Sequence, residues 1–192
     1  MILASNSKRR QEILRDMGFN FKVLTSDIEE ISDKEEISEM ILDIAEKKLD
    51  KIAKENVNEF VLAADTVVEL NGKIFGKPKD MEEAFSFLKT LSGNTHKVIT
   101  AYVFKNISKN ILIKEVVISE VKFLELDNEI INWYLGTAEP FDKAGAYGIQ
   151  GYGRILVEKI NGDFYSIMGF PISNFLENLR KIGYKISQID RI

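Results

Sequence analysis

The stretch Val61–Phe75, VLAADTVVELNGKIF, decides the fold class of this chain. Its first part, Val61–Ala64, is a continuous apolar run, which is typical of a strand buried on both faces of a sheet. The segments Thr66–Leu70 and Lys73–Phe75 then flank Asn71-Gly72, a dipeptide that favours a two-residue hairpin turn. A doubly buried strand beside a hairpin predicts a mixed sheet and therefore an α/β fold.

Further elements are expected on both sides of this stretch. The predicted strands are Ile2–Ala4, Phe19–Leu24, Thr95–Lys105, Asn110–Leu124, Arg154–Ile160 and Asp163–Met168, the last two paired around Asn161-Gly162. The predicted helices are one that Ser7 caps and that runs to about Met17, and those at Ile37–Lys54, Met81–Leu91, Asn128–Leu135 and Pro171–Ile182. With 192 residues, 45% of them hydrophobic, residues 1–192 are expected to form a single domain.

Composition excludes several classes of function. The net charge of −4 argues against a nucleic-acid-coating protein. Without cysteine there are no disulfides and no thiolate metal sites, and the one histidine, His96, is expected to pack at the start of a strand. No apolar run approaches the ~20 residues of a membrane helix, and the N-terminal MILA has no signal-peptide pattern. We therefore expect a cytoplasmic protein without nucleic-acid or membrane partners.

The segment Glu139–Gly151, EPFDKAGAYGIQG, has the character of a site. Its apolar residues repeat neither at a period of two nor at 3.6. It joins the charges of Glu139, Asp142 and Lys143 to the amide of Gln150 and to glycines that let backbone approach a ligand. The alternative interpretation is an irregular surface loop.

A second candidate lies at Ser5–Arg10, SNSKRR, where a strand is expected to lead into a helix. The first turn of a helix offers unpaired N–H groups and the positive end of the dipole, which suit a phosphate. The cations Lys8, Arg9 and Arg10 oppose that dipole, a penalty that a bound anion would offset. The alternative is a solvated basic patch.

One lysine interrupts an apolar helix face. Lys48 falls near the middle of the apolar stripe of Ile37–Lys54, so it either snorkels to an edge or points at an anion, whereas Lys47 lies off the stripe. Asp65 is expected to end the most buried strand, at the usual ligand crevice of an α/β sheet. Lys77, in a loop, either contacts phosphate or is exposed.

Carboxylates and amides supply the remaining candidates. The residues alone do not separate Glu29 from Glu30 as a partner for Asp65, and Asp142 is a third carboxylate. Two or three carboxylates with waters would hold Mg²⁺ bridged to phosphates. Thr66 and Gln150 are suited to recognising a base or positioning a phosphate oxygen.

Five segments together resemble the Maf family of nucleoside triphosphate pyrophosphatases. They are LASNSKRR at Leu3–Arg10, ADTVV at Ala64–Val68, GKPKD at Gly76–Asp80, LSGNTHKVIT at Leu91–Thr100 and EPFDKAGAYGIQG at Glu139–Gly151. The family pattern has proline where this chain has Lys8. The resemblance implies a long curved mixed β-sheet with flanking helices and two lobes around a central cleft. It also implies cleavage of a nucleoside triphosphate between its α and β phosphates, with Mg²⁺ or Mn²⁺.

The resemblance further implies residue roles, and it decides for Glu30 over Glu29. The implied catalytic residues are Asp65, Glu30, Lys48 and Lys77, with Glu30 and Asp65 also as metal ligands. The implied substrate-binding residues are Ser5, Arg9, Arg10, Thr66, Asp142, Lys143 and Gln150. Asp65 remains either general base or metal ligand. Thr66 and Gln150 resemble the branch that acts on dTTP, UTP and modified pyrimidine nucleotides rather than the branch that prefers a methylated guanosine triphosphate.

Two other functions remain open from the sequence. One is a non-catalytic nucleotide-binding regulator of cell division and septum formation, which would bind nucleotide without releasing pyrophosphate. The other is a purine-selective house-cleaning pyrophosphatase, which would prefer inosine triphosphate to pyrimidine nucleotides. A homodimer is also left open.

Overall fold

The computed structural model describes residues 1–25, 27–137 and 139–192. Within these residues it contains a seven-stranded sheet of order β2-β1-β3-β5-β6-β7, with β4 paired to β3. The strands are β1 Ile2–Leu3, β2 Lys22–Val23, β3 Val61–Leu70, β4 Lys73–Phe75, β5 Thr95–Asn106, β6 Ile111–Phe123 and β7 Val157–Asn161. Strand β1 pairs in parallel with β2 and β3, whereas β3–β4 and β6–β7 are antiparallel. The predicted α/β fold with a mixed sheet is therefore confirmed.

The helices also follow the sequence signals. The α-helices are α1 Lys8–Asp16, α2 Ile37–Ala53, α3 Met81–Leu91, α4 Asn128–Leu135, α5 Phe164–Met168 and α6 Ile172–Lys181. Short 3-10 helices are η1 Glu139–Asp142, η2 Ala144–Ala146, η3 Gly151–Leu156 and η4 Ile186–Arg191. Ser7, Asp80 and Asp127 cap α1, α3 and α4 by accepting a backbone N–H of the first turn, as such side chains do. Among the described residues, none of these helices combines the length and hydropathy needed to cross a membrane.

The chain divides into two compact units. The first comprises Met1–Asp65, Thr100–Val117 and Gly169–Ile192, and the second comprises Thr66–Ile99 and Ile118–Met168. Strands β3, β5 and β6 contribute residues to both.

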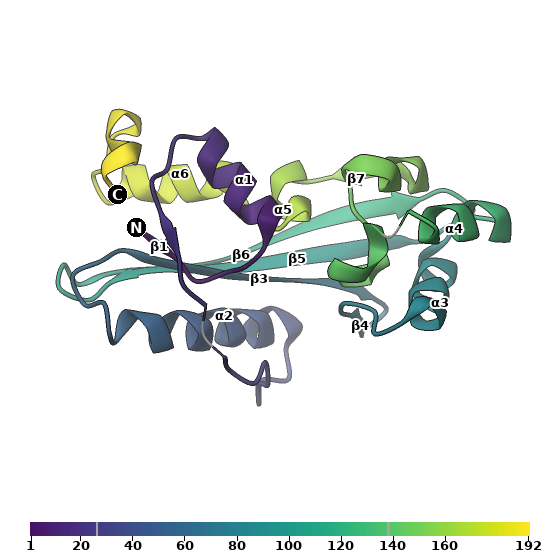
Figure 1. Ribbon diagram of the computed structural model, residues 1–192, viewed down its shortest axis with the longest axis horizontal. Coiled ribbons are helices and arrows are strands. Elements are labelled where there is room, and N and C mark those ends of the chain that lie inside the picture. The colour runs from purple at the N-terminus through teal and green to yellow at the C-terminus, as the bar shows by residue number, and fades with distance from the viewer. Residues whose placement is uncertain (26, 138) are drawn as a thin grey trace. The chain divides into compact units, whose positions relative to one another are not determined.

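In the first unit, α2 covers one face of the strands, and α1 and α6 cover the opposite face (Figure 1). The apolar side of α2 packs against alternate residues of β1 and β3. This cluster consists of Ile2, Ala4, Ala45, Leu49, Ile52, Ala53, Val61, Ala63 and Val103. Full burial of one such leucine or isoleucine contributes about 1.5–3 kcal/mol relative to exposure.

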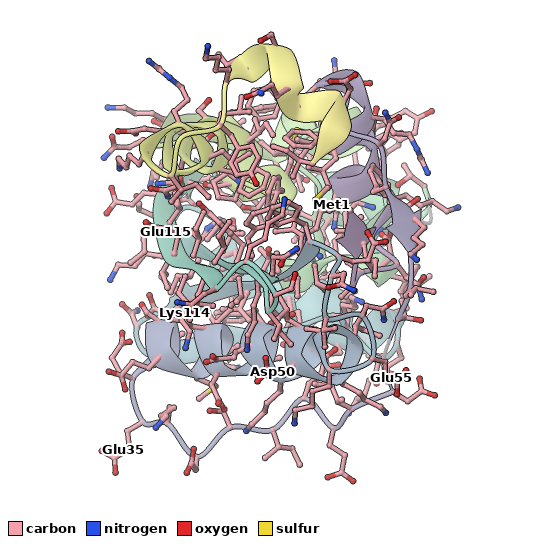
Figure 2. The ribbon with its side chains drawn as sticks, turned by 90° about the vertical axis from the view of Figure 1, so that its left-hand side faces the viewer. Met1, Glu35, Asp50, Glu55, Lys114 and Glu115 are labelled. Carbon is pink, nitrogen blue, oxygen red and sulfur yellow. The ribbon has the colours of Figure 1, made fainter. Side chains whose placement is uncertain are left out.

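The opposite face of the first unit is aromatic. Phe175 of α6 lies at its centre, with ring centroids 5.5 Å from Tyr102, 5.2 Å from Phe104 and 5.2 Å from Phe170. Successive side chains of β6 point to opposite faces of the sheet. Figure 2 shows that Lys114 points to the α2 side and Glu115 to the α6 side. Lys114 pairs with Glu46 of α2, and Glu115 accepts a hydrogen bond from Asn178 of α6.

The second unit contains the predicted hairpin. Asn71 and Gly72 have φ of 53° and 79°, the positive values that a tight turn of this hand requires at both central positions. Helix α3 packs against α4 and against η2, which lies in the glycine-containing segment Glu139–Gly151.

One predicted strand is wrong, and another begins later than expected, because Arg154–Leu156 belong to η3 and β7 begins at Val157. Asp163–Met168 was expected to pair with the strand before Asn161, but residues Phe164–Met168 form helix α5. The strand that precedes Gly162, β7, pairs with β6. The Asp163 carboxylate accepts the N–H of Tyr165 at 2.8 Å, and Ser166 donates to the Asp163 carbonyl at 2.8 Å. These local hydrogen bonds begin a helical turn directly after Gly162, and they outweigh the strand preference of the aromatic residues.

Candidate functional site

An ion-pair cluster in the first unit joins three of the predicted site residues. Lys48 Nζ lies 2.8 Å from Asp65 Oδ1 and 2.8 Å from Glu30 Oε1. The side chains of Lys48 and Asp65 are 15% and 17% exposed, and that of Glu30 is 61% exposed. The lysine therefore points at two carboxylates from its apolar helix face rather than snorkelling into open solvent.

Strand and helix periodicity together place this cluster. Val61 and Ala63 of β3 face α2, so Asp65, two residues further on, lies on the same face. Lys48 is one residue before Leu49, which packs in that interface. The expectation that Asp65 ends its strand is wrong, because β3 continues to Leu70. What changes at Asp65 is burial: four fully buried residues give way to three half-buried ones. The carboxylate is thus held by a continuous strand at the point where the strand becomes accessible.

The acidic loop before α2 distinguishes its two glutamates. Glu30 reaches Lys48, whereas Glu29 lines a hollow on the polar side of α2. Lys47 belongs to that polar side as well, since its side chain is 45% exposed and pairs with Asp43 at 2.7 Å. The structure therefore brings Glu30, and not Glu29, to the Asp65 carboxylate.

The basic segment at the start of α1 divides into different environments. Arg10 is buried, and its Nε and Nη2 donate to the Gly169 carbonyl at 3.0 and 2.9 Å. Its Nη1 donates to Ser5 Oγ at 2.5 Å. Burial lowers the pKa of Arg10 to about 10, while the charge of Asp65 opposes this change. Arg10 thus fixes the Ser5 loop and brings a positive charge within range of Asp65, and the half-buried Arg9 precedes it.

The second unit holds the other predicted residues. Thr66 is half-buried in β3, and Lys77 is exposed in the loop before α3. The Gly76 carbonyl of that loop accepts the Gly145 N–H at 3.0 Å, so the GKPKD loop lies against the glycine-containing segment. Lys143 Nζ donates to Asp142 Oδ1 at 2.6 Å and to the Glu139 carbonyl at 2.6 Å.

Sequence reasoning missed two residues at this segment. Glu139 Oε1 accepts from the Tyr134 hydroxyl at 3.2 Å, and Oε2 accepts from the Tyr152 N–H at 2.8 Å. Tyr134 in turn accepts the Gly148 N–H at 3.0 Å. Glu139 was noticed only as one charge among several, and Tyr134, within the predicted helix Asn128–Leu135, was not singled out. No periodicity signals this contact, which arises from tertiary folding.

His96 packs at the start of β5, as expected. It is 1% exposed, and its Nε2 lies 2.8 Å from the Tyr147 hydroxyl. Its Nδ1 is buried without a hydrogen-bond partner among the described residues. Burial lowers the pKa of His96 to about 4 and raises the pKa of Tyr147. The imidazole is therefore neutral near pH 7 and serves packing.

The side chains of this site that are suited to hold a divalent cation are the carboxylates of Glu30 and Asp65. Across residues 1–25, 27–137 and 139–192, no three acidic or histidine side chains gather into a ready metal cage. Glu30 and Asp65 do converge on one point, because both contact the same ammonium. Two carboxylates completed by waters and phosphate oxygens are the usual protein share of a Mg²⁺ site.

Comparisons with known proteins agree over nearly the whole chain. The family model described as "Maf-like protein" matches residues 1–182. A dTTP/UTP pyrophosphatase of Fusobacterium nucleatum is 82% identical over 192 residues, covering 100% of both chains. A dTTP/UTP pyrophosphatase of Pyrococcus furiosus is 46% identical over 190 residues, covering 98% of each chain. One of Clostridium novyi is 41% identical over 189 residues, covering 97% of this chain and 99% of its own.

Proposed function

The chain belongs to the Maf-like protein family, and from this premise we propose that it is a nucleoside triphosphate pyrophosphatase acting on dTTP and UTP. The products are the nucleoside monophosphate and pyrophosphate. Its similar relatives carry that activity in their names. The observation that carries the proposal in this chain is the convergence of Lys48, Asp65 and Glu30.

Asp65 is the group we assign to the attacking water. Its carboxylate accepts the water proton as the oxygen forms a bond to the α-phosphorus and the bond to the bridging α–β oxygen breaks. Pyrophosphate leaves with the electrons of that bond. The alternative assignment for Asp65 is metal ligation. Lys48 contacts the Asp65 carboxylate at 2.8 Å and is assigned, together with Arg9 and Arg10, to supply positive charge where the phosphates develop negative charge.

The residues present fit a divalent cation. Glu30 and Asp65 bring two negative charges to the single positive charge of the Lys48 ammonium, which leaves negative charge that a cation can compensate. Mg²⁺ or Mn²⁺ held there would neutralise phosphate charge and orient the triphosphate. We assign Glu30 as a protein ligand of this cation, with Asp65 as a second ligand under the alternative assignment, and leave Asp142 to substrate binding.

Base selection is assigned to uncharged groups of the second unit. Thr66 follows Asp65 directly in β3, and Gln150 lies between two glycines of the late segment. Their hydroxyl and amide offer donors and acceptors that match the polar edge of a pyrimidine. Lys77 and Lys143 are the cations assigned to bind phosphate from this unit, and Ser5 is assigned the same role in the first unit.

A nucleotide panel with detection of pyrophosphate tests the proposal. We expect the highest kcat/KM with dTTP and UTP, and lower values with inosine and methylated guanosine triphosphates. Binding without pyrophosphate release would instead support a nucleotide-binding regulator. Preference for inosine triphosphate would support a purine-selective enzyme.

A further inference from the structure

We propose that Glu139 is the positioning residue for base selection, because its carboxylate fixes the backbone on both sides of Gln150. The inference rests on the proposed function, in which Gln150 contacts the base. Glu139 itself touches no substrate in this scheme. It acts by holding one segment of the second unit, Gly148–Tyr152, in a single conformation.

Two chains of hydrogen bonds start from this carboxylate. Oε2 accepts the N–H of Tyr152, two residues after Gln150, at 2.8 Å. Oε1 accepts the Tyr134 hydroxyl at 3.2 Å, and that hydroxyl accepts the N–H of Gly148, two residues before Gln150, at 3.0 Å. Gln150 therefore lies midway between two backbone groups that one carboxylate anchors.

The glycines that precede and follow Gln150, Gly148 and Gly151, make room for the Glu139 carboxylate. A Cβ at Gly148 would lie 2.7 Å from Glu139 Oε1 and 2.9 Å from Lys143 Cε, and a Cβ at Gly151 would lie 2.6 Å from Glu139 Oε2. Gly151 also has a φ of 61°, which suits glycine. Gly148 has no such backbone requirement, so contact with side chains is what excludes a larger residue there. The backbone at Gly148 and at Gly151 therefore lies close to the Glu139 carboxylate.

A carboxylate suits this place better than an amide. The Tyr152 N–H and the Tyr134 hydroxyl both donate to Glu139, one to each oxygen. An ionised carboxylate accepts at both oxygens, whereas a glutamine would turn an NH₂ donor toward one of these donors. The change Glu139→Gln keeps the volume and removes one anchor, which makes it the informative substitution.

If Glu139 positions Gln150, its substitution should reduce the selectivity between bases and leave the rate of catalysis largely unchanged. Discrimination between bases depends on hydrogen-bond groups held in place, and a mobile Gln150 adapts to the wrong base as well as the right one. The chemistry assigned to Lys48 and Asp65 does not require Glu139. The expected signature is therefore a change in the ratio of kcat/KM values between bases, carried mainly by KM.

The experiment measures kcat, KM and calorimetric Kd for dTTP and for inosine triphosphate in three variants of the full chain. Glu139→Gln is expected to reduce the dTTP preference by about tenfold or more while kcat for dTTP stays within about threefold. Gly148→Ala should also reduce the preference, because the new Cβ would displace the ends of the Glu139 and Lys143 side chains. The control Glu158→Gln, at an exposed strand position of the same unit, should leave the preference unchanged.

The outcomes that would overturn the role of Glu139 are specific. An unchanged preference in Glu139→Gln overturns the inference, and so does a parallel loss with both nucleotides accompanied by a lower melting temperature, which marks a purely structural role. If wild type binds nucleotides but releases no pyrophosphate, the proposed activity fails, and the Kd ratio still tests Glu139. A wild type that prefers no base in Kd or kcat/KM overturns the inference.

Discussion

Lys48 of helix α2 and Asp65 of strand β3 meet with their charged atoms 2.8 Å apart at the edge of an apolar interface. Both side chains are mostly buried, and Glu30 adds a second carboxylate to the same ammonium at 2.8 Å. Charges in such surroundings interact more strongly than charges in water, so each partner restrains the other. The pair therefore links the packing of the first unit to its proposed chemistry.

Replacing Lys48 with methionine should reduce turnover at least tenfold, which is about 1.4 kcal/mol of transition-state stabilisation. Methionine fills the volume of the stem, but it leaves the Asp65 carboxylate without its ammonium. We expect the free energy of unfolding to fall by about 1–2 kcal/mol for that reason. Steady-state pyrophosphate release and urea unfolding measure the two effects. Lys47→Met, one residue away on the polar side of α2, is the matched control, and equal losses in both variants would remove Lys48 from the site.

Asp65→Asn should strongly reduce turnover, whereas the variant should still bind nucleotide. If Asp65 activates water, turnover falls by about 10²–10⁴, since the amide has no useful basicity. Affinity for a non-hydrolysable dTTP analogue should persist or rise, because one negative charge near the triphosphate is removed. Pyrophosphate release and calorimetry on the same preparation check this. Turnover within a few-fold of wild type would transfer the base role to Glu30 or Asp142.

Removal of divalent cations should stop the reaction. The carboxylates of Glu30 and Asp65 would repel a triphosphate unless a bridging cation compensates them. We expect EDTA to abolish turnover and Mg²⁺ or Mn²⁺ to restore it. Glu30→Gln should raise the Mg²⁺ concentration needed for half-maximal activity, whereas Glu29→Gln, directed to the hollow beside α2, should not. Full activity in chelator would contradict the metal assignment.

His96 should make the protein less stable in mild acid. Its pKa is about 4 in the folded state and 6.5 in the unfolded chain, so the unfolded chain binds the extra proton between these values. Stability from the neutral imidazole is therefore complete above pH 6.5 and is lost as the pH falls toward 4. The loss is at most roughly 3 kcal/mol.

Urea unfolding between pH 7 and pH 4 measures this effect against His96→Gln. The amide keeps a hydrogen-bonding partner for Tyr147 and does not titrate, so the carboxylates contribute equally to both proteins. Wild type should lose more stability than the variant across this range. Parallel pH profiles would show that His96 becomes protonated without unfolding the protein.

The sequence alone predicted the mixed sheet, and the caps at Ser7, Asp80 and Asp127, because these features depend on local patterns. A continuous apolar run marks a buried strand, Asn71-Gly72 supplies the positive φ values of a hairpin, and a capping side chain needs only its neighbours three residues away. The lysine on the apolar face of α2 was visible for the same reason, since helix periodicity fixes which face a residue occupies.

Tertiary structure decided the relationships between distant segments. Periodicity placed Lys48 on a face, but only the packing of α2 on β3 brought it to Asp65, and the path of the loop brings Glu30, the glutamate that the family resemblance favoured, to Lys48. The helix at Phe164–Met168 was mispredicted because the Asp163 N–H donates to Ser119 Oγ of β6 at 2.9 Å, a tertiary contact that acts with the local hydrogen bonds of Asp163 to start a helical turn. The charge of Glu139 was visible in the sequence, but its contacts were not, since its partners Tyr134 and Tyr152 meet it only after the chain has folded.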